Sequence, residues 1–250
     1  MANVRAVVLA AGRGVRMGGA QPKTLIPLGE HSEMLHYILA GLKRAGVEEL
    51  MVITGFQPPK IQEFVTEHWG EATYVFNARY ASWGNFHSVR VALDQSPGMD
   101  VMFVNSDVIV HPDVYGRVMD TRGDLVLAVQ QRYDLDEEDM KVRVDRGRVG
   151  AIGKELPKRL SQGEFAGVSL VRPLGAAAYL EVASDLEWDA RTHVYYEDIY
   201  GAMLPRIEAR SAAVEAGEYA EVDTPDDMRV AADVIERNHD VWGAPEAQPA

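Results

Sequence analysis

Residues 4–30 read VRAVVLAAGRGVRMGGAQPKTLIPLGE, and the fold can be worked out from this stretch outward. Its first part, Val4–Leu9, is a short run of apolar and β-branched residues, which is typical of a strand buried on both faces. A loop crowded with glycine and arginine follows directly. In open α/β sheets, ligands bind beyond the carboxyl ends of the strands. The loop is therefore the first candidate for a binding site.

The same stretch contains no carboxylate before Glu30, although the whole chain has 38 acidic residues against 25 basic ones. Gly12 and Gly14 have no side chain, so backbone N–H groups there can approach a ligand closely. Consecutive N–H groups in such a turn form a concavity for phosphate oxygens. Positive charge is added by Arg13, Arg16 and Lys23. The pattern predicts a phosphate-binding loop, and the alternative is a flexible turn with solvated arginines.

Strand and helix patterns alternate through the first 130 residues. The expected strands are Val4–Leu9, Leu50–Thr54, Thr73–Phe76, Val101–Val104 and Leu125–Val129. The expected helices are Glu33–Ala45, Pro59–His68, Asn85–Gln95 and Pro112–Met119. This alternation predicts an α/β fold with a largely parallel sheet and helices on both faces.

Beyond residue 130 the pattern changes. The expected elements are a hairpin of Val142–Val144 with Val149–Ile152, a strand Phe165–Val171, helices Pro173–Ala183 and Glu197–Ile207, a strand pair Ala212–Glu215 and Ala220–Val222, and a helix Pro225–Asn238. No internal repeat and no long linker divides the sequence. We expect one domain over residues 1–240 and a disordered tail over residues 241–250, which are rich in proline and alanine.

The composition excludes several classes of protein. A net charge of -13 argues against nucleic acid as a partner, because phosphate neutralisation needs a basic face. It also argues against binding to an anionic membrane surface. The absence of cysteine excludes disulfides and cysteine-based sites. There is no signal-peptide pattern and no apolar run of about 18 residues, so we expect a soluble cytoplasmic protein.

The loop does not match the two most common phosphate-binding patterns. A Walker A loop needs GxxxxGK[ST], but here Lys23-Thr24 follows Pro22. A dinucleotide fingerprint needs GxGxxG, but Met17 stands at the position of the third glycine.

The longer pattern LAAGRGVRM followed by PKTLIPL resembles the signature of the nucleotidyltransferases that activate sugar phosphates and small phospho-alcohols, LAAGxGxRM/L followed by PK. The matching residues are Leu9, Ala10, Ala11, Gly12, Gly14, Arg16, Met17, Pro22 and Lys23. The resemblance implies a single-domain, Rossmann-like (GT-A-like) nucleotidyltransferase fold with a mixed, mostly parallel sheet flanked by helices. It also implies that residues 1–130 bind the nucleotide and residues 131–240 bind the acceptor.

In that family the loop wraps the triphosphate of an NTP, and an acceptor phosphate oxygen attacks the α-phosphorus and expels pyrophosphate. The resemblance implies that Gly12, Gly14 and Arg13 hold the β- and γ-phosphates, and that Lys23 stabilises charge at the α-phosphorus. This chemistry requires positioned cations rather than a covalent nucleophile.

Two carboxylates are candidates for a Mg²⁺ site, which such transfer requires. Asp107 follows the expected strand Val101–Val104, and Asp223 stands in EVDTPDD, residues 221–227. Each has a simpler explanation as a turn or helix cap. The resemblance implies instead that Asp107 is a metal-binding and catalytic residue, that Asp223 completes the metal site, and that Glu221 contacts substrate or metal.

The segment NARYASWGNFHS, residues 77–88, resembles the N-x-x-Y…N-x-x-S element of the cytidylyltransferase branch. The resemblance implies that Asn77, Asn85 and Ser88 bind the base and ribose. Amide groups suit a pyrimidine edge, which needs paired donors and acceptors. Asn85 could equally cap the following helix.

Three later segments resemble the phosphocholine cytidylyltransferases and their phosphonate-activating relatives: residues 137–156, 163–171 and 194–200. The resemblance implies that Lys141 and Lys154 lie near the acceptor phosphate, although Lys141 could be an exposed strand residue. The tyrosines and acids of YYED can hold an ammonium group by cation–π contact and charge. The predicted acceptor residues there are Tyr196, Glu197 and Asp198. The alternative is that the tyrosines fill the core and the acids begin a helix.

Together these features predict a Mg²⁺-dependent cytidylyltransferase that transfers CMP from CTP to a small phosphorylated or phosphonylated acceptor and releases pyrophosphate. The acceptor would resemble phosphocholine, aminoethylphosphonate or hydroxyethylphosphonate. The nearest alternative is a sugar-1-phosphate nucleotidyltransferase that uses UTP, GTP or dTTP. A more remote alternative is a non-catalytic, nucleotide-binding regulatory module. The sequence does not fix the acceptor, the base or the oligomeric state, and a homodimer stays open.

Overall fold

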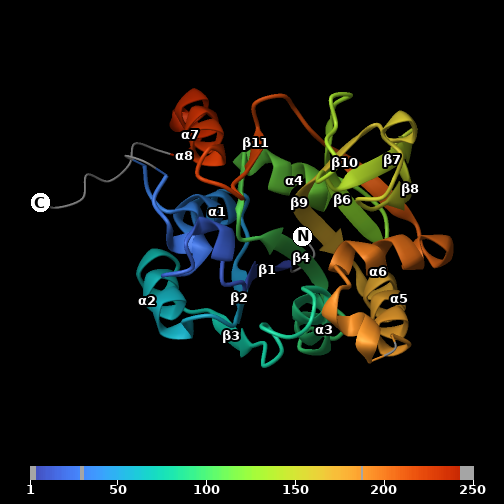
Figure 1. Ribbon diagram of the computed structural model, residues 1–250, viewed down its shortest axis with the longest axis horizontal. Coiled ribbons are helices and arrows are strands. Elements are labelled where there is room, and N and C mark those ends of the chain that lie inside the picture. The colour runs from blue at the N-terminus through green and yellow to red at the C-terminus, as the bar shows by residue number, and fades with distance from the viewer. Residues whose placement is uncertain (1–3, 29–30, 187, 243–250) are drawn as a thin grey trace, which may run out of the picture.

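The computed structural model describes residues 4–28, 31–186 and 188–242 (Figure 1). The strands are β1 (Val4–Ala10), β2 (Glu49–Thr54), β3 (Thr73–Phe76), β4 (Asp100–Asn105), β5 (Val108–Val110), β6 (Leu125–Gln131), β7 (Lys141–Asp145), β8 (Arg148–Ile152), β9 (Gly163–Val171), β10 (Ala209–Val214) and β11 (Tyr219–Glu221). The α-helices are α1 (Met34–Arg44), α2 (Pro58–His68), α3 (Phe86–Asp94), α4 (Pro112–Asp120), α5 (Pro173–Ser184), α6 (Tyr196–Met203), α7 (Asp227–Arg237) and α8 (His239–Trp242). None of the described helices is long and apolar enough to span a membrane.

Nine strands form one central sheet in the order β3-β2-β1-β4-β9-β6-β10-β8-β7. The pairs β3–β2, β2–β1, β1–β4 and β6–β10 are parallel. The strand β9 is antiparallel to both of its neighbours, β4 and β6. Strands from before and after residue 130 therefore share one sheet, and β9 from the second half lies between β4 and β6 from the first.

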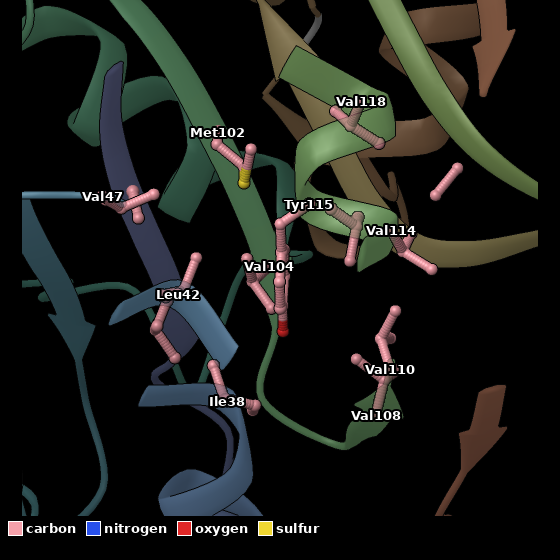
Figure 2. Packing of buried hydrophobic residues seen from close by; sticks show 14 of the residues in the cluster. Ile38, Leu42, Val47, Met102, Val104, Val108, Val110, Val114, Tyr115 and Val118 are labelled. Carbon is pink, nitrogen blue, oxygen red and sulfur yellow. The ribbon is translucent and has the colours of Figure 1, made fainter. Parts of the chain in front are cut away.

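Helices cover both faces of this sheet, as the sequence predicts (Figure 1). Side chains alternate along β1, so that Ala6 and Val8 face one core and Val7 faces the other. The first core includes residues of α1, α2 and α4, and the second includes residues of α3, α5 and α6. Figure 2 shows Tyr115 of α4 packed between α1 and β4 in the first core. A Cβ on Gly41 of α1 would lie 2.7 Å from the Tyr115 ring, so only glycine allows this approach.

A small second sheet positions the candidate site. In it, β5 pairs antiparallel with β11. The backbone N–H of Val222 donates to the carbonyl oxygen of Asp107 at 2.9 Å. This pairing brings Asp107, which follows β4, beside Glu221 and Asp223, which follow more than 100 residues later. The sequence pattern does not predict β5, because three residues directly after another strand give no separate signal.

The expected elements before residue 130 are found with bounds that shift by a few residues. The predicted hairpin is β7–β8, whose turn holds Arg146 and Gly147 at φ +48° and +76°. The expected strand pair of residues 212–222 is different: β10 joins β6 in the central sheet, while β11 joins β5. The helix expected to reach Ile207 is an α-helix only to Met203 and continues as a 3₁₀ turn that contains Pro205.

The far C-terminus was expected to be a disordered tail from residue 241. Residues 241 and 242 belong to α8, and residues 243–250 lie outside the described part of the chain.

Candidate active site

The loop after β1 lines a cavity of about 360 Å³, which we call the glycine cavity. Gly14 has a left-handed backbone with φ +62°, and a Cβ there would lie 2.6 Å from the Cβ of Lys23. Glycine is therefore required at this position. A Cβ on Gly12 would meet no heavy atom within 4 Å, so the space beside it is open. Within the described part of the chain, no acceptor binds the backbone N–H groups of Gly12 and Gly14, which leaves both available to an anion.

The residues predicted to bind the nucleotide come together at the glycine cavity. Its lining includes Leu9, Ala10, Ala11, Gly12, Gly14, Asn77, Asn85, Ser88 and Asp107. Lys23 lines it as well. Arg13 does not belong to the described lining, because its guanidinium lies against Phe56, 5.3 Å from the ring centre. Arg16 lines the cavity instead and lies 2.9 Å from Asp223.

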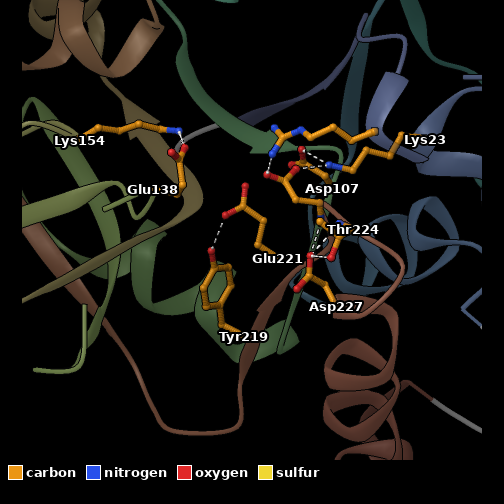
Figure 3. Close-up of polar contacts among 10 residues, drawn as sticks. Lys23, Asp107, Glu138, Lys154, Tyr219, Glu221, Thr224 and Asp227 are labelled. Atoms are coloured by element: carbon orange, nitrogen blue, oxygen red, sulfur yellow. Dashed lines mark hydrogen bonds and ion pairs between the residues drawn. The ribbon is translucent and has the colours of Figure 1, made fainter. Parts of the chain in front are cut away.

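Lys23 joins the two aspartates that the sequence could not pair (Figure 3). Its Nζ atom donates to Oδ2 of Asp107 at 3.0 Å and to Oδ1 of Asp223 at 2.5 Å. Burial tends to lower the pKa of the Lys23 ammonium, but Asp107 and Asp223 outweigh it and hold the pKa above its usual range. Burial tends to raise the pKa of Asp223, but Lys23 and Arg16 hold it below its usual range. Lys23 and Asp223 are therefore both charged at neutral pH.

The same residues fit a hard divalent cation. Asp107, Glu221 and Asp223 each offer a carboxylate oxygen, and these oxygens lie within 4.8 Å of one another. Mg²⁺ prefers carboxylate oxygens and waters as ligands. Burial, together with the negative charges of Asp107 and Asp223, raises the pKa of Glu221, although the Lys23 ammonium opposes this rise. The donor set therefore suits Mg²⁺, and the ammonium of Lys23 supplies the positive charge between Asp107 and Asp223.

The amide side chains on the other wall hold fixed positions. Asn77 donates from Nδ2 to Oγ of Ser88 at 2.9 Å, and both side chains are buried. Asn85 makes no capping bond at the start of α3. Instead its Oδ1 accepts from the backbone N–H of Tyr196 at 2.9 Å. This bond ties the wall of the glycine cavity to the start of α6.

A second cavity of about 460 Å³ adjoins the first. The two share Arg16, Asn85, Asn105, Asp107 and Asp223. We call the second one the carboxylate cavity, because its lining includes Asp107, Glu138, Asp139, Glu164, Glu197, Glu221, Asp223 and Asp227. The two cavities thus meet at the aspartates that Lys23 bridges.

Three of the six predicted acceptor residues line the carboxylate cavity: Lys154, Glu197 and Glu221. Tyr196 lies behind the lining, fully buried, and its hydroxyl donates to Oδ1 of Asn105 at 2.8 Å. The tyrosine thus fills the core, as the simpler explanation had it.

Lys141 and Asp198 are also outside the described lining of both cavities. Lys141 is neither an exposed strand residue nor turned toward a cavity, because its ammonium is buried against backbone carbonyls. The Asp198 carboxylate accepts from the backbone N–H of Tyr195 at 2.7 Å and caps α6.

Besides Glu221, two further glutamates of this cavity have a raised pKa. Glu197 is 4% exposed, and its Oε2 atom is buried without a hydrogen-bond partner among the described residues. Burial raises its pKa to about 8. Burial also raises the pKa of Glu164, to about 7, despite the opposing effect of Arg132. Both carboxyl groups therefore change charge near neutral pH.

Several residues of this cavity are not among those predicted from the sequence. Glu164 is the lone acid in the apolar segment EFAGVSLV, and that contrast is a signal that could have identified it. Tyr219, whose hydroxyl donates to Glu221 at 3.4 Å, and Arg132 carry no comparable local signal.

Known proteins share this fold. The solved structure of the inositol-1-phosphate CTP transferase from T. maritima superimposes with a TM-score of 0.78, over 94% of this chain and 97% of that one, at 20% identity. This likeness confirms the predicted fold class.

Two curated relatives are more similar in sequence. The bifunctional IPC transferase and DIPP synthase of Thermococcus kodakarensis is 33% identical over 153 residues, 61% of this chain and 34% of that protein. The CMP-5'-(3-aminopropyl)phosphonate synthase of Streptomyces rubellomurinus is 34% identical over 123 residues, 46% of this chain and 19% of that protein. The chain therefore spans only about a third or less of the length of these two relatives.

A family model, that of the MobA-like NTP transferase domain, matches residues 6–173, which is more than half of the chain. The match runs from β1 through β9 and includes the glycine loop, Lys23 and Asp107. It confirms the resemblance to nucleotidyltransferases that the opening stretch indicated. This chain belongs to the MobA-like NTP transferase domain family.

Proposed function

We propose that the protein is a Mg²⁺-dependent cytidylyltransferase that transfers CMP from CTP to a small phosphorylated or phosphonylated acceptor. The observation that carries this proposal is the position of Lys23. Its ammonium bridges Asp107 and Asp223 where the two cavities meet. A donor in one cavity and an acceptor in the other would bring their phosphorus groups together at this cation.

The glycine cavity would receive the nucleotide. Its free N–H groups at Gly12 and Gly14 would bind triphosphate oxygens, and Arg16 would add charge. Asn77, Asn85 and Ser88 would face the base and ribose. An NTP in this orientation presents its α-phosphate to Lys23 and Asp107.

The reaction would be a direct displacement. An oxygen of the acceptor phosphate or phosphonate forms a bond to the α-phosphorus of CTP, while the bond from that phosphorus to the bridging oxygen of pyrophosphate breaks. The acceptor is already an anion, so no general base is needed. Lys23 would stabilise the negative charge spread over the α-phosphate. Bound Mg²⁺, held by Asp107 and Asp223 with Glu221 nearby, would neutralise charge on the reacting groups.

Two observations support CTP and an acceptor of this class. The T. maritima and Streptomyces proteins are named for CTP and for a CMP-linked phosphonate. The carboxylate cavity combines basic residues, Lys154 and Arg132, with several carboxylates. This mixture suits an acceptor that carries both an anionic phosphorus group and a polar or cationic end.

The proposal is tested by measuring pyrophosphate release from CTP, UTP, GTP and dTTP. Each nucleotide is combined with phosphocholine, aminoethylphosphonate, hydroxyethylphosphonate, inositol 1-phosphate and a sugar 1-phosphate. We expect the highest kcat/KM for CTP with a phosphate or phosphonate of a small alcohol or amine. Preference for UTP, GTP or dTTP with a sugar 1-phosphate would favour the alternative enzyme. If the wild-type protein bound CTP but no pair of nucleotide and acceptor released pyrophosphate, transferase activity would be contradicted.

A further inference from the structure

Lys141 is a buried lysine whose ammonium binds only main chain. The residue is 1% exposed and begins β7. Its Nζ atom donates to the carbonyl oxygens of Asp136 at 3.1 Å, Glu137 at 2.8 Å and Asp139 at 3.2 Å. An ammonium has three protons, so its hydrogen-bonding capacity is filled. Burying a charge costs free energy unless hydrogen bonds compensate it in this way. Breaking these bonds would leave the buried ammonium without partners, so they hold residues 136–139 in place.

Most side chains of the segment that Lys141 holds repel one another. The acidic loop, which we define as Asp134–Asp139, has the sequence DLDEED, with five acids in six residues. Like charges at this density repel one another and favour an extended, mobile chain. Lys154 lies 3.1 Å from Glu138, and Lys158 lies 3.3 Å from Glu137, but both of these glutamates are largely exposed. Exposed ion pairs contribute little to order. Asp139 accepts from the backbone N–H of Asp136, and Lys141 is the fully buried charge that binds three backbone carbonyl oxygens of the loop.

The acidic loop forms one wall of the carboxylate cavity. Glu138 and Asp139 line the cavity, and Asp139 binds Arg132, which also approaches Glu164 at 3.4 Å. Figure 3 shows the contact between Glu138 and Lys154, which lies across from the cluster of Lys23 and Asp107. No residue of the acidic loop belongs to the described lining of the glycine cavity. Movement of the loop would therefore change one cavity and leave the other intact.

We propose that Lys141 is a positioning residue for the acceptor: it does not touch the acceptor, but it holds the acidic loop in the shape that binds it. This inference rests on the proposed function, since it assigns the carboxylate cavity to the acceptor. Lys141 would therefore control the affinity for the acceptor although it is outside the described lining of the cavity. Replacing that lysine should weaken acceptor binding without affecting CTP.

The test uses Lys141→Met, which keeps most of the length of the side chain and removes the three N–H donors. Hydrogen exchange of the backbone amides of residues 134–140 is measured first, without substrates. We expect exchange there to be about tenfold faster or more, as loss of charge-assisted hydrogen bonds implies, with unchanged exchange in residues 86–94 of α3. We then expect KM for the acceptor to rise about tenfold or more, while KM for CTP stays within about twofold.

Lys158→Met is the matched control. It removes a lysine charge that pairs with Glu137 of the acidic loop, but Lys158 belongs to the described lining of neither cavity. We expect loop exchange and acceptor KM to stay at wild-type values. If Lys158→Met raised the acceptor KM as much as Lys141→Met, loop charge rather than the buried Lys141 would be responsible, and the inference would be wrong.

Leu135→Ala covers the case in which Lys141→Met does not fold. Leu135 is 4% exposed and is the buried apolar residue of the acidic loop, outside the described lining of both cavities. It should loosen the loop and raise the acceptor KM in the same way. Unchanged loop exchange, or equal rises in both KM values, would overturn the inference. Failure of the proposed function is seen separately, as absence of pyrophosphate release from the wild-type protein.

Discussion

The glycine cavity and the carboxylate cavity meet at the same two aspartates but are built in different ways. The glycine cavity begins with consecutive residues of one loop, and the groups proposed to bind an anion there are backbone N–H groups. The carboxylate cavity is lined by side chains from β6, β9, α6, β11 and the acidic loop. Backbone groups suit a triphosphate, which every NTP shares, whereas charged side chains suit discrimination among acceptors. Substitutions in the glycine cavity should therefore affect turnover with every acceptor. Substitutions in the carboxylate cavity should change which acceptor is preferred.

The largest effect on turnover is expected from Lys23, where the two cavities meet. Lys23→Met should lower kcat by about 10²–10³-fold, because it removes a cation placed where charge develops. Turnover is measured as pyrophosphate release at saturating CTP and acceptor. Lys43→Met is the control, since Lys43 binds the backbone oxygen of His68 on the surface. Near-normal turnover in Lys23→Met would show that Lys23 does not take part in catalysis. It would also contradict a reaction at the point where the two cavities meet.

The second prediction concerns the metal. Asp107→Asn should abolish the dependence of turnover on Mg²⁺ concentration, since it removes one of three clustered carboxylates. Binding of Mn²⁺ to the nucleotide-free protein provides a measurement independent of activity. There Lys23→Met should bind Mn²⁺ more tightly than wild type, because the bridging ammonium repels a cation. Unchanged Mn²⁺ binding in both variants would place the metal elsewhere.

The third prediction separates two glycines in one loop. Gly14→Ala should lower the free energy of unfolding by about 1–2 kcal/mol, because its backbone is left-handed and the new Cβ overlaps Lys23. Gly12→Ala should leave stability unchanged, because the new methyl group meets no other atom. It should raise KM for CTP, because the methyl group would project into the space proposed for the nucleotide. Chemical denaturation and steady-state kinetics measure the two effects. Equal loss of stability in both variants would mean that Gly12 is also structural.

The last prediction concerns Glu197 and depends on pH. Its pKa in the folded protein is about 8, against an ordinary value of 4.5, so the folded chain keeps a proton that the unfolded chain releases. Stability from this group is complete below about pH 4.5 and is lost as the pH rises toward 8. Glu197→Gln should remove this decline, which amounts to at most about 1.4 kcal/mol per pH unit. Denaturation curves at pH 5 and pH 8 measure this decline in the free energy of unfolding. An equal decline in wild type and Glu197→Gln would show that Glu197 does not carry the proton responsible.

Much of the glycine cavity could be predicted because its information is local. The strand Val4–Leu9, the glycine loop and Lys23 lie within 20 residues, and backbone geometry decides what such a loop can bind. Each of the nine residues predicted for the nucleotide lines that cavity. Among the charged residues of the loop, Arg13 does not line the cavity. The position of a flexible arginine depends on its partners in the tertiary structure, and here the guanidinium lies against Phe56.

The sequence by itself determined the alternating pattern of strands and helices, the glycine at position 14 and the isolated positive charge of the first 29 residues. Only the tertiary structure decided which distant residues meet. The pairing of β5 with β11 brings Asp107 to Asp223, and no local pattern specifies a contact across 116 positions. Lys141 shows the same limit: strand periodicity does not reveal that its ammonium is buried against the carbonyls of a loop. The physical reason is that periodicity reports which face is apolar, whereas the partner of a charged group depends on how the whole chain packs.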